Sequence, residues 1–168
     1  MLIQIREEHP DDVAAVREVN RLAFGQEQES NIVEALRTNG GALLSLIATV
    51  NGQVAGHIMY SPLTVAENVQ SVALGPMAVV PEYQRQGIGT QLIEGGNRKI
   101  KDAGYPFIIV VGHAQYYPGF GSRPAIESGI KWEWDISGRS FHVLVLNEAK
   151  MQGASGLAKY RHEFSTIS

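Results

Sequence analysis

Apolar positions recur every three or four residues in two stretches near the start of the chain. Residues 10–24 and 30–38 show this spacing, which predicts two helices that each bury one face. Pro10 is tolerated in a first helical turn, and Ser30 is a residue type that caps helix N-termini. Ahead of both helices, residues 2–5 predict a short strand. The inward faces of the two helices are expected to comprise Val13, Val16, Val19, Asn20, Ala23, Ile32, Val33 and Leu36.

The following part of the chain has the pattern of a β-sheet. Residues 43–50 and 53–60 are two strand-like runs joined by Asn51-Gly52, a dipeptide typical of two-residue hairpins. Residues 69–80 form a longer run that contains Gly75-Pro76. Because proline has no backbone N–H, it indicates an edge, a bulge or a kink in a strand. A kink here is expected to push neighbouring strands apart.

A strand–helix–strand unit is predicted over residues 77–111. The helix is indicated by apolar or small residues at a spacing of four, namely Ile88, Leu92, Gly96 and Ile100. Residues 107–111 are apolar without alternation, as in a parallel strand covered on both faces. Two glycines, Gly95-Gly96, lie in mid-helix at a cost of about 1 kcal/mol each relative to alanine. They indicate either close packing on a sheet or ligand, or simple sequence drift.

The C-terminal part predicts two closing strands, over residues 131–135 and 141–146, with Ser137-Gly138 between them. Before them, Pro118-Gly119-Phe120-Gly121 indicates a turn. The tail from Asn147 is polar and contains glycine. The chain shows no internal repeats and no linker, so residues 1–168 are expected to form one domain.

The segment from Gln84 to Thr90 joins the strand at residues 77–80 to the predicted helix. A strand, a glycine loop and a helix in this order aim several backbone N–H groups at one anion. Gly87 and Gly89 have no Cβ and let a bound group come close to the backbone. A P-loop is excluded because no Lys-Ser/Thr pair follows the glycines, and the dinucleotide fingerprint needs glycine where this chain has Leu92.

The pattern that fits is Gln/Arg-x-x-Gly-x-Gly/Ala, filled by Gln84, Gly87 and Gly89. This loop and the order of elements resemble the GNAT superfamily of N-acetyltransferases over nearly the whole chain, and the tail is similar to a bacterial subgroup. The resemblance implies an α/β (α+β) domain: a mixed sheet of about seven strands flanked by about four helices. It also implies that two parallel strands, the one before the loop and the one after the helix, splay apart. A homodimer is compatible with this resemblance.

The resemblance implies acetyl-CoA as co-substrate and no metal. Its thiol arm would lie between the splayed strands and bond to backbone like an added strand. The residues expected to bind it are Met77, Ala78 and Val79 along the arm, and Gln84, Arg85, Gln86, Gly87, Ile88, Gly89 and Thr90 at the diphosphate. Side chains at positions 77 and 79 are also consistent with an ordinary core strand.

Acetyl transfer needs a base for the amine, whose reference pKa is about 10.4 when lysine-like, and an acid for the leaving thiolate. The family's acid is a tyrosine followed by glycine at the fourth position and then usually phenylalanine. Tyr117 fits with Gly121, but Ser122 replaces the phenylalanine, so Tyr116 stays an alternative. His113 is a candidate base, with Glu82 or a water chain as alternatives. Each of these side chains is also consistent with a purely structural or surface role.

Composition narrows the function classes. The net charge of −3 gives no support for a nucleic-acid partner, and the absence of cysteine excludes thiol catalysis and thiolate metal sites. No signal peptide or membrane-spanning run is evident, so a cytoplasmic enzyme is expected. The acceptor would be a small-molecule or peptide amine, and the resemblance implies that residues 25–31 line its pocket. Alternatives are a catalytically silent acyl-CoA sensor or a nucleotide-phosphate enzyme of another fold.

Overall fold

The computed structural model describes residues 1–112, 120–133 and 140–166. They form one nine-stranded sheet in which β1 to β5, β8 and β6 follow one another in the order β1-β2-β3-β4-β5-β8-β6, while β9 pairs with both β3 and β7. The strands are β1 (Ile3–Glu7), β2 (Leu44–Val50), β3 (Gln53–Val65), β4 (Val69–Val79), β5 (Phe107–Gly112), β6 (Arg123–Pro124), β7 (Ile130–Trp132), β8 (Ser140–Val145) and β9 (Gly156–Tyr160). The expected mixed α/β sheet is confirmed.

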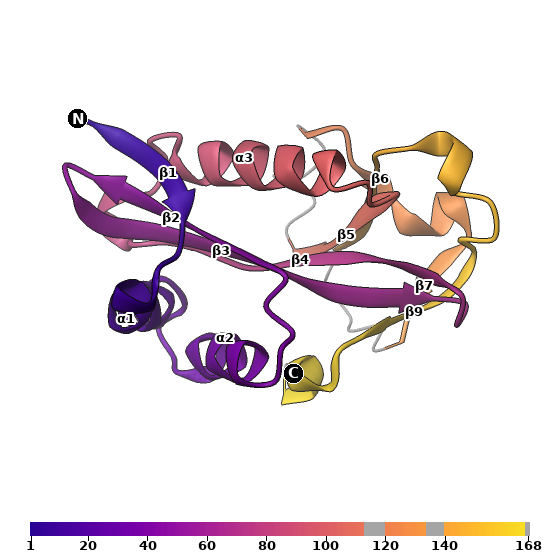
Figure 1. Ribbon diagram of the computed structural model, residues 1–168, viewed down its shortest axis with the longest axis horizontal. Coiled ribbons are helices and arrows are strands. Elements are labelled where there is room, and N and C mark those ends of the chain that lie inside the picture. The colour runs from indigo at the N-terminus through magenta and orange to yellow at the C-terminus, as the bar shows by residue number, and fades with distance from the viewer. Residues whose placement is uncertain (113–119, 134–139, 167–168) are drawn as a thin grey trace.

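Helices cover both faces of the sheet (Figure 1). α3 (Ile88–Asp102) lies on one face, while α1 (Val13–Phe24) and α2 (Gln28–Thr38) lie on the other, beside the C-terminal 3₁₀ turn His162–Thr166. The core under α3 joins its buried residues to the inner faces of β2, β3, β4 and β5. Within the described residues no helix is long and apolar enough to cross a membrane.

The two N-terminal helices occur where the apolar spacing predicts them, with one correction. α1 follows a 3₁₀ turn at Pro10–Asp12 and ends at Gly25, whose φ of 70° is the left-handed conformation that stops a helix. α2 begins at Gln28, two residues before the expected start. Ser30 is therefore not its N-cap: the side chain is buried and its hydroxyl donates to the Arg17 carbonyl oxygen at 2.8 Å.

The predicted hairpin is confirmed, but its second strand is longer than expected. Asn51 and Gly52 have φ values of 51° and 86°, as a type I′ turn requires. β3 continues past Tyr60 to Val65 because its far half pairs with β4 on one side and with β9 in the tail on the other, where Leu63 lies opposite Tyr160. The polar tail gives little strand pattern of its own, and this pairing raises the strand count above the expected seven.

The described residues contain three α-helices rather than about four. The resemblance places the fourth between β5 and β7, where residues 113–119 lie outside the described residues and residues 120–129 contain a 3₁₀ turn at Ala125–Ser128. Gly129, with a φ of 74°, ends that turn directly before β7. So few residues between two strands leave no room for a full helix in residues 120–129.

β4 and β5 are parallel and separate as expected. They pair only at Val72–Ile108, Ala73–Ile109 and Leu74–Val110. Directly after Leu74 comes Gly75-Pro76, and from there β4 runs on to Val79 without β5 beside it in the ladder. Since Pro76 has no N–H to donate, the ladder ends where the sequence predicts. The two strands thus open a wedge, which we define as the gap beside Met77–Val79.

Candidate functional site

The glycine loop presents a row of backbone amides at the start of α3. Among the described residues, the N–H groups from Arg85 to Thr90 have no hydrogen-bond partner. Gln84 does not join this row, because its backbone N–H donates to the Pro81 carbonyl oxygen at 3.3 Å. The first helical bond of α3 runs from the Gln91 amide to the Gly87 carbonyl oxygen at 3.1 Å. An anion at this helix end would meet unpaired donors and the positive end of the helix dipole.

Two residues of the loop adopt left-handed backbone. Arg85 has a φ of 63°, and Gly87 has a φ of 87° and caps α3. A left-handed residue followed by a right-handed one, as at Gly87 and Ile88, turns successive N–H groups toward one side, which is the geometry of a backbone anion nest; we use this name for the amides of Arg85–Thr90. A Cβ built on Gly87 would meet no protein atom within 4 Å, so the space in front of this residue is open.

Two glutamine side chains brace the loop. The side-chain nitrogen Nε2 of Gln84 donates to the Val79 carbonyl oxygen at 2.9 Å, and Nε2 of Gln86 donates to the Glu82 carbonyl oxygen at 3.2 Å. Gln84 thereby fastens the loop to the last residue of β4. This side-chain hydrogen bond therefore adds to the chain connection between the anion nest and the wedge.

The wedge side of β4 has no strand beside Met77–Val79 in the part of the chain that the structure describes. Met77, Ala78 and Val79 pair with β3 on one side, opposite Ile58, His57 and Gly56 respectively. On the side that faces β5 these three residues have no ladder partner among the described residues, and the Val79 carbonyl oxygen accepts the hydrogen bond from the Gln84 side chain. Ala78 and Val79 are buried and Met77 is half-buried, so their side chains pack in the core while one backbone edge stays available. An extended amide-containing chain could add to this edge as a strand does.

The comparisons with known proteins agree with this geometry. The model of the acetyltransferase (GNAT) family matches residues 8–118. The chain belongs to the GNAT family. It is 31% identical over 163 residues to the uncharacterized N-acetyltransferase YhbS of Escherichia coli K12, covering 96% of this chain and 98% of YhbS. The uncharacterized N-acetyltransferase YjhQ of the same strain is 37% identical over 118 residues, covering 67% of this chain and 65% of YjhQ.

Two solved GNAT structures are similar over nearly the whole chain. The crystal structure of Escherichia coli YhbS in complex with CoA has a TM-score of 0.93 and 30% identity, and covers 99% of this chain and 93% of that one. A Brucella melitensis GNAT acetyltransferase in complex with acetyl-CoA has a TM-score of 0.82 and 30% identity, and covers 97% of this chain and 98% of that one. The GNAT fold is therefore shown for this chain.

The predicted catalytic side chains lie mostly outside the described residues. His113, Tyr116 and Tyr117 all fall between residues 113 and 119. Glu82 is described, and it is exposed in the 3₁₀ turn before the anion nest. The GNAT motif position that departs from the family pattern, Ser122, has a buried hydroxyl with no hydrogen-bond partner among the described residues.

The link between α1 and α2, expected to line the acceptor pocket, carries less free negative charge than its sequence indicates. Glu27 is ion-paired with Arg17, which also binds Glu34 at 2.9 Å. Glu29 accepts a hydrogen bond from the Gln26 side-chain amide at 3.0 Å. Of the two glutamates in this link, only Glu29 has no cationic partner among the described residues, so it is the better candidate to attract an amine.

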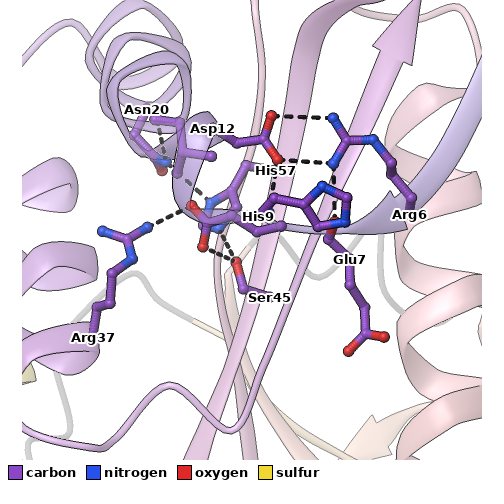
Figure 2. A network of polar contacts seen from close by, with 10 residues as sticks. Arg6, Glu7, His9, Asp12, Asn20, Arg37, Ser45 and His57 are labelled. Carbon is purple, nitrogen blue, oxygen red and sulfur yellow. Dashed lines mark hydrogen bonds and ion pairs between the residues drawn. The ribbon is translucent and has the colours of Figure 1, made fainter.

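A buried polar network lies between β2, β3 and the helices α1 and α2, next to the β3 segment that pairs with Met77–Val79, and the sequence patterns did not reveal it (Figure 2). His57 on β3 is fully buried, and its two ring nitrogens contact Asn20 on α1 at 3.1 Å and Ser45 on β2 at 2.9 Å. The Ser45 hydroxyl donates to Glu8 at 2.9 Å, and Arg37 of α2 pairs with the other Glu8 oxygen at 2.6 Å. A histidine inside an apolar strand run is the one sequence signal that could have pointed here.

The network specifies the state of the His57 ring. The Asn20 side-chain nitrogen also donates to the Val16 carbonyl oxygen at 3.0 Å, so this end of the carboxamide is the NH₂ group. His57 Nδ1 must then accept, and Nε2 carries the hydrogen and donates to Ser45. Burial, followed by the nearby Arg37 charge, lowers the pKa of His57 to about 3. The ring is neutral at physiological pH and does not act as a titrating base there.

A second pair in the same region fixes the start of α1. The Arg6 guanidinium donates to both Asp12 carboxylate oxygens, at 2.8 and 3.1 Å, and the His9 amide donates to one of them at 2.7 Å (Figure 2). The hydrogen bond from Arg6 lowers the pKa of Asp12 to about 2. This clamp joins β1 to α1 and stabilises the side of the sheet on which the His57 network lies.

Proposed function

We propose that this GNAT protein transfers the acetyl group of acetyl-CoA to a primary amine by direct attack in a ternary complex. One observation carries the proposal: the unpaired amides of Arg85–Thr90 lie next to the open backbone edge at Met77–Val79. CoA has the matching chemistry, since a diphosphate is joined to an extended arm that contains amides. The CoA and acetyl-CoA complexes of the two similar GNAT structures support the same assignment.

The proposed binding mode divides the co-substrate between two backbone surfaces. The diphosphate accepts hydrogen bonds from the anion nest, with Gly87 and Gly89 leaving space for it. The arm adds to Met77–Val79 as a further strand, and its acyl end points toward Leu74, where β4 and β5 meet. Because the two surfaces belong to one strand–loop–helix unit, their spacing is fixed before the ligand binds.

The proposed chemistry needs no enzyme-bound acyl group. The amine nitrogen attacks the thioester carbonyl carbon, the carbon–sulfur bond breaks, and the amide product forms. A base takes the proton that the amine loses, with His113, Glu82 or water as candidates, and Tyr117 or Tyr116 protonates the leaving thiolate. The absence of cysteine in the chain excludes a route through an acyl-cysteine.

Binding and turnover assays test the proposal separately. Acetyl-CoA at 100 times its Kd should stabilise the protein by about 2.7 kcal/mol, which a thermal-shift titration detects. Release of free CoA thiol in the presence of a panel of small amines and peptides should then follow. No stabilisation by any acyl-CoA would overturn the proposal. Binding without turnover over the whole panel would favour an acyl-CoA sensor instead.

A further inference from the structure

We propose that His57 is a positioning residue for the thiol arm of the acyl-CoA. Its ring holds the segment of β3 that supports the wedge side of β4. The inference rests on the proposed function, because it concerns the same arm. It differs from the function assignment in that it gives a role to a side chain that touches no substrate.

The ladder beside the wedge places His57 next to the proposed binding edge. His57 lies opposite Ala78, in the middle of the three-residue segment whose other edge is open. A strand segment in mid-sheet is normally held from both sides by neighbouring strands. Among the described residues only β3 contributes ladder hydrogen bonds here, so the position of Met77–Val79 follows the position of Gly56–Ile58.

Side-chain hydrogen bonds fix this part of β3 on the face that α1 covers. Both ring nitrogens of the fully buried His57 are bonded, one to α1 through Asn20 and one to β2 through Ser45. Ser45 is held by Glu8, which is anchored by Arg37 from α2. Since the Glu8 side chain is only 8% exposed, this ion pair is shielded from water. The ring therefore connects β3 to an otherwise rigid polar assembly.

On its opposite face, the same segment of β3 packs against α3. A Cβ on Gly56 would lie 3.0 Å from Leu92 and 3.2 Å from Ile88, both at the start of α3. The absence of a side chain thus lets the helix that carries the anion nest rest directly on β3. Gly56 thus sets the distance between the anion nest and β3 on one face of the sheet, and His57 fixes β3 on the other face. Together they define the offset between diphosphate and arm.

The experiment compares two ligands on the wild-type chain and the His57→Leu variant by calorimetry. Acetyl-CoA has the arm, whereas 3′-phosphoadenosine 5′-diphosphate is the half of CoA that lacks it. We expect His57→Leu to weaken acetyl-CoA about tenfold, because small misplacements of a binding edge are costly, and to leave the armless nucleotide within about twofold. Equal losses for both ligands, or no loss for acetyl-CoA, would overturn the inference.

A matched control separates positioning from general destabilisation. Met59 is fully buried in the cluster under α1 and α2, but it lies beyond the segment that pairs with Met77–Val79. Met59→Ala should lower Tm while both ligands keep their affinities within about twofold. If His57→Leu does not fold, His57→Asn keeps an acceptor for Asn20 and should show the same selective loss, about threefold.

The two proposals fail in different ways. If the wild-type chain does not bind acetyl-CoA, the proposed function itself is wrong. If it binds acetyl-CoA more tightly than the armless nucleotide, and the His57 variants keep that preference, only the positioning role is wrong.

Discussion

The Tyr60 ring on β3 occupies the place where a side chain on Gly96 of α3 would lie. A Cβ built on Gly96 would overlap the Tyr60 hydroxyl, while that hydroxyl donates to Asn97 at 2.7 Å. Tyr60 is fully buried and cannot move aside into solvent. The mid-helix glycine is thus explained by close packing of α3 on the sheet, one of the two interpretations that the sequence left open.

Gly96→Ala should destabilise the protein although alanine is the better helix former. Forcing a methyl group into a packed core typically costs about 1–3 kcal/mol, more than the roughly 1 kcal/mol gained in helix propensity. The adjacent Gly95 is the matched control, because its Cβ would meet Ile5 and Leu46 at 3.6 and 3.9 Å, which is ordinary contact. Urea unfolding should place Gly95→Ala at or above wild type. Equal effects of both changes would contradict the packing argument.

Gly87→Leu should abolish acetyl-CoA binding with little loss of fold. The residue has a φ of 87°, which costs a side chain about 1–2 kcal/mol, and the new side chain would fill the anion nest. Gly104→Leu carries a similar backbone cost at φ 92°, with open space around it, at the other end of α3. Calorimetry should find binding lost in the first variant and kept in the second. A parallel loss in both would show that helix stability, not the nest, controls binding.

Tyr117→Phe should reduce turnover far more than affinity for acetyl-CoA. Removing a general acid typically lowers kcat by about 10²-fold or more, while a ring without a hydroxyl keeps most packing contacts. Tyr116→Phe is the natural counterpart, since it removes the same hydroxyl one residue earlier. Steady-state kinetics with a responsive amine would distinguish them. Unchanged kcat in Tyr117→Phe together with a drop in Tyr116→Phe would assign the acid to Tyr116.

The free energy of unfolding should fall in acid as the Glu163 carboxylate becomes protonated. Its side chain is 1% exposed, and hydrogen bonds from Arg161 and then Asn39 lower its pKa from the ordinary 4.5 to about 2. The folded protein therefore releases this proton more readily than the unfolded chain does. The stabilisation is complete above about pH 4.5 and is lost as pH falls toward 2.

The Glu163→Gln variant tests this pH dependence. It should be less stable than wild type at pH 7, and the difference should shrink as the pH falls from 4.5 toward 2. Chemical unfolding at pH 7, 4 and 3 would measure it. A stability difference that is the same at all three pH values would show that the Glu163 charge is not linked to folding.

Local patterns predicted the elements that build the proposed binding surface. Asn51-Gly52 predicted the hairpin because few dipeptides accept two left-handed residues in succession. Gly75-Pro76 predicted the end of the β4–β5 ladder because proline removes a donor. Gly87 and Gly89 predicted a loop with unpaired backbone amides, because glycine lets a bound group come close to the backbone. Each of these features depends on backbone chemistry within a few residues, so the sequence reports it directly.

Other features needed contacts between residues far apart in the chain. The pairing of β9 with β3 joins Tyr160 to Leu63, and the tail by itself has too little alternation to predict a strand. The 3₁₀ turn at Ala125–Ser128 likewise depends on the strands on either side of it, β6 and β7.

The sequence by itself determined the family-like order of elements, the kink in β4 and the glycine loop, since steric rules on φ, proline and turns act within a few residues. Only the tertiary structure decided that Asn20, Ser45 and His57 meet and that Tyr60 requires glycine at position 96. Such contacts arise when separate elements bury surface against one another. Their energy depends on complementary shape and paired polar groups, which no local pattern encodes.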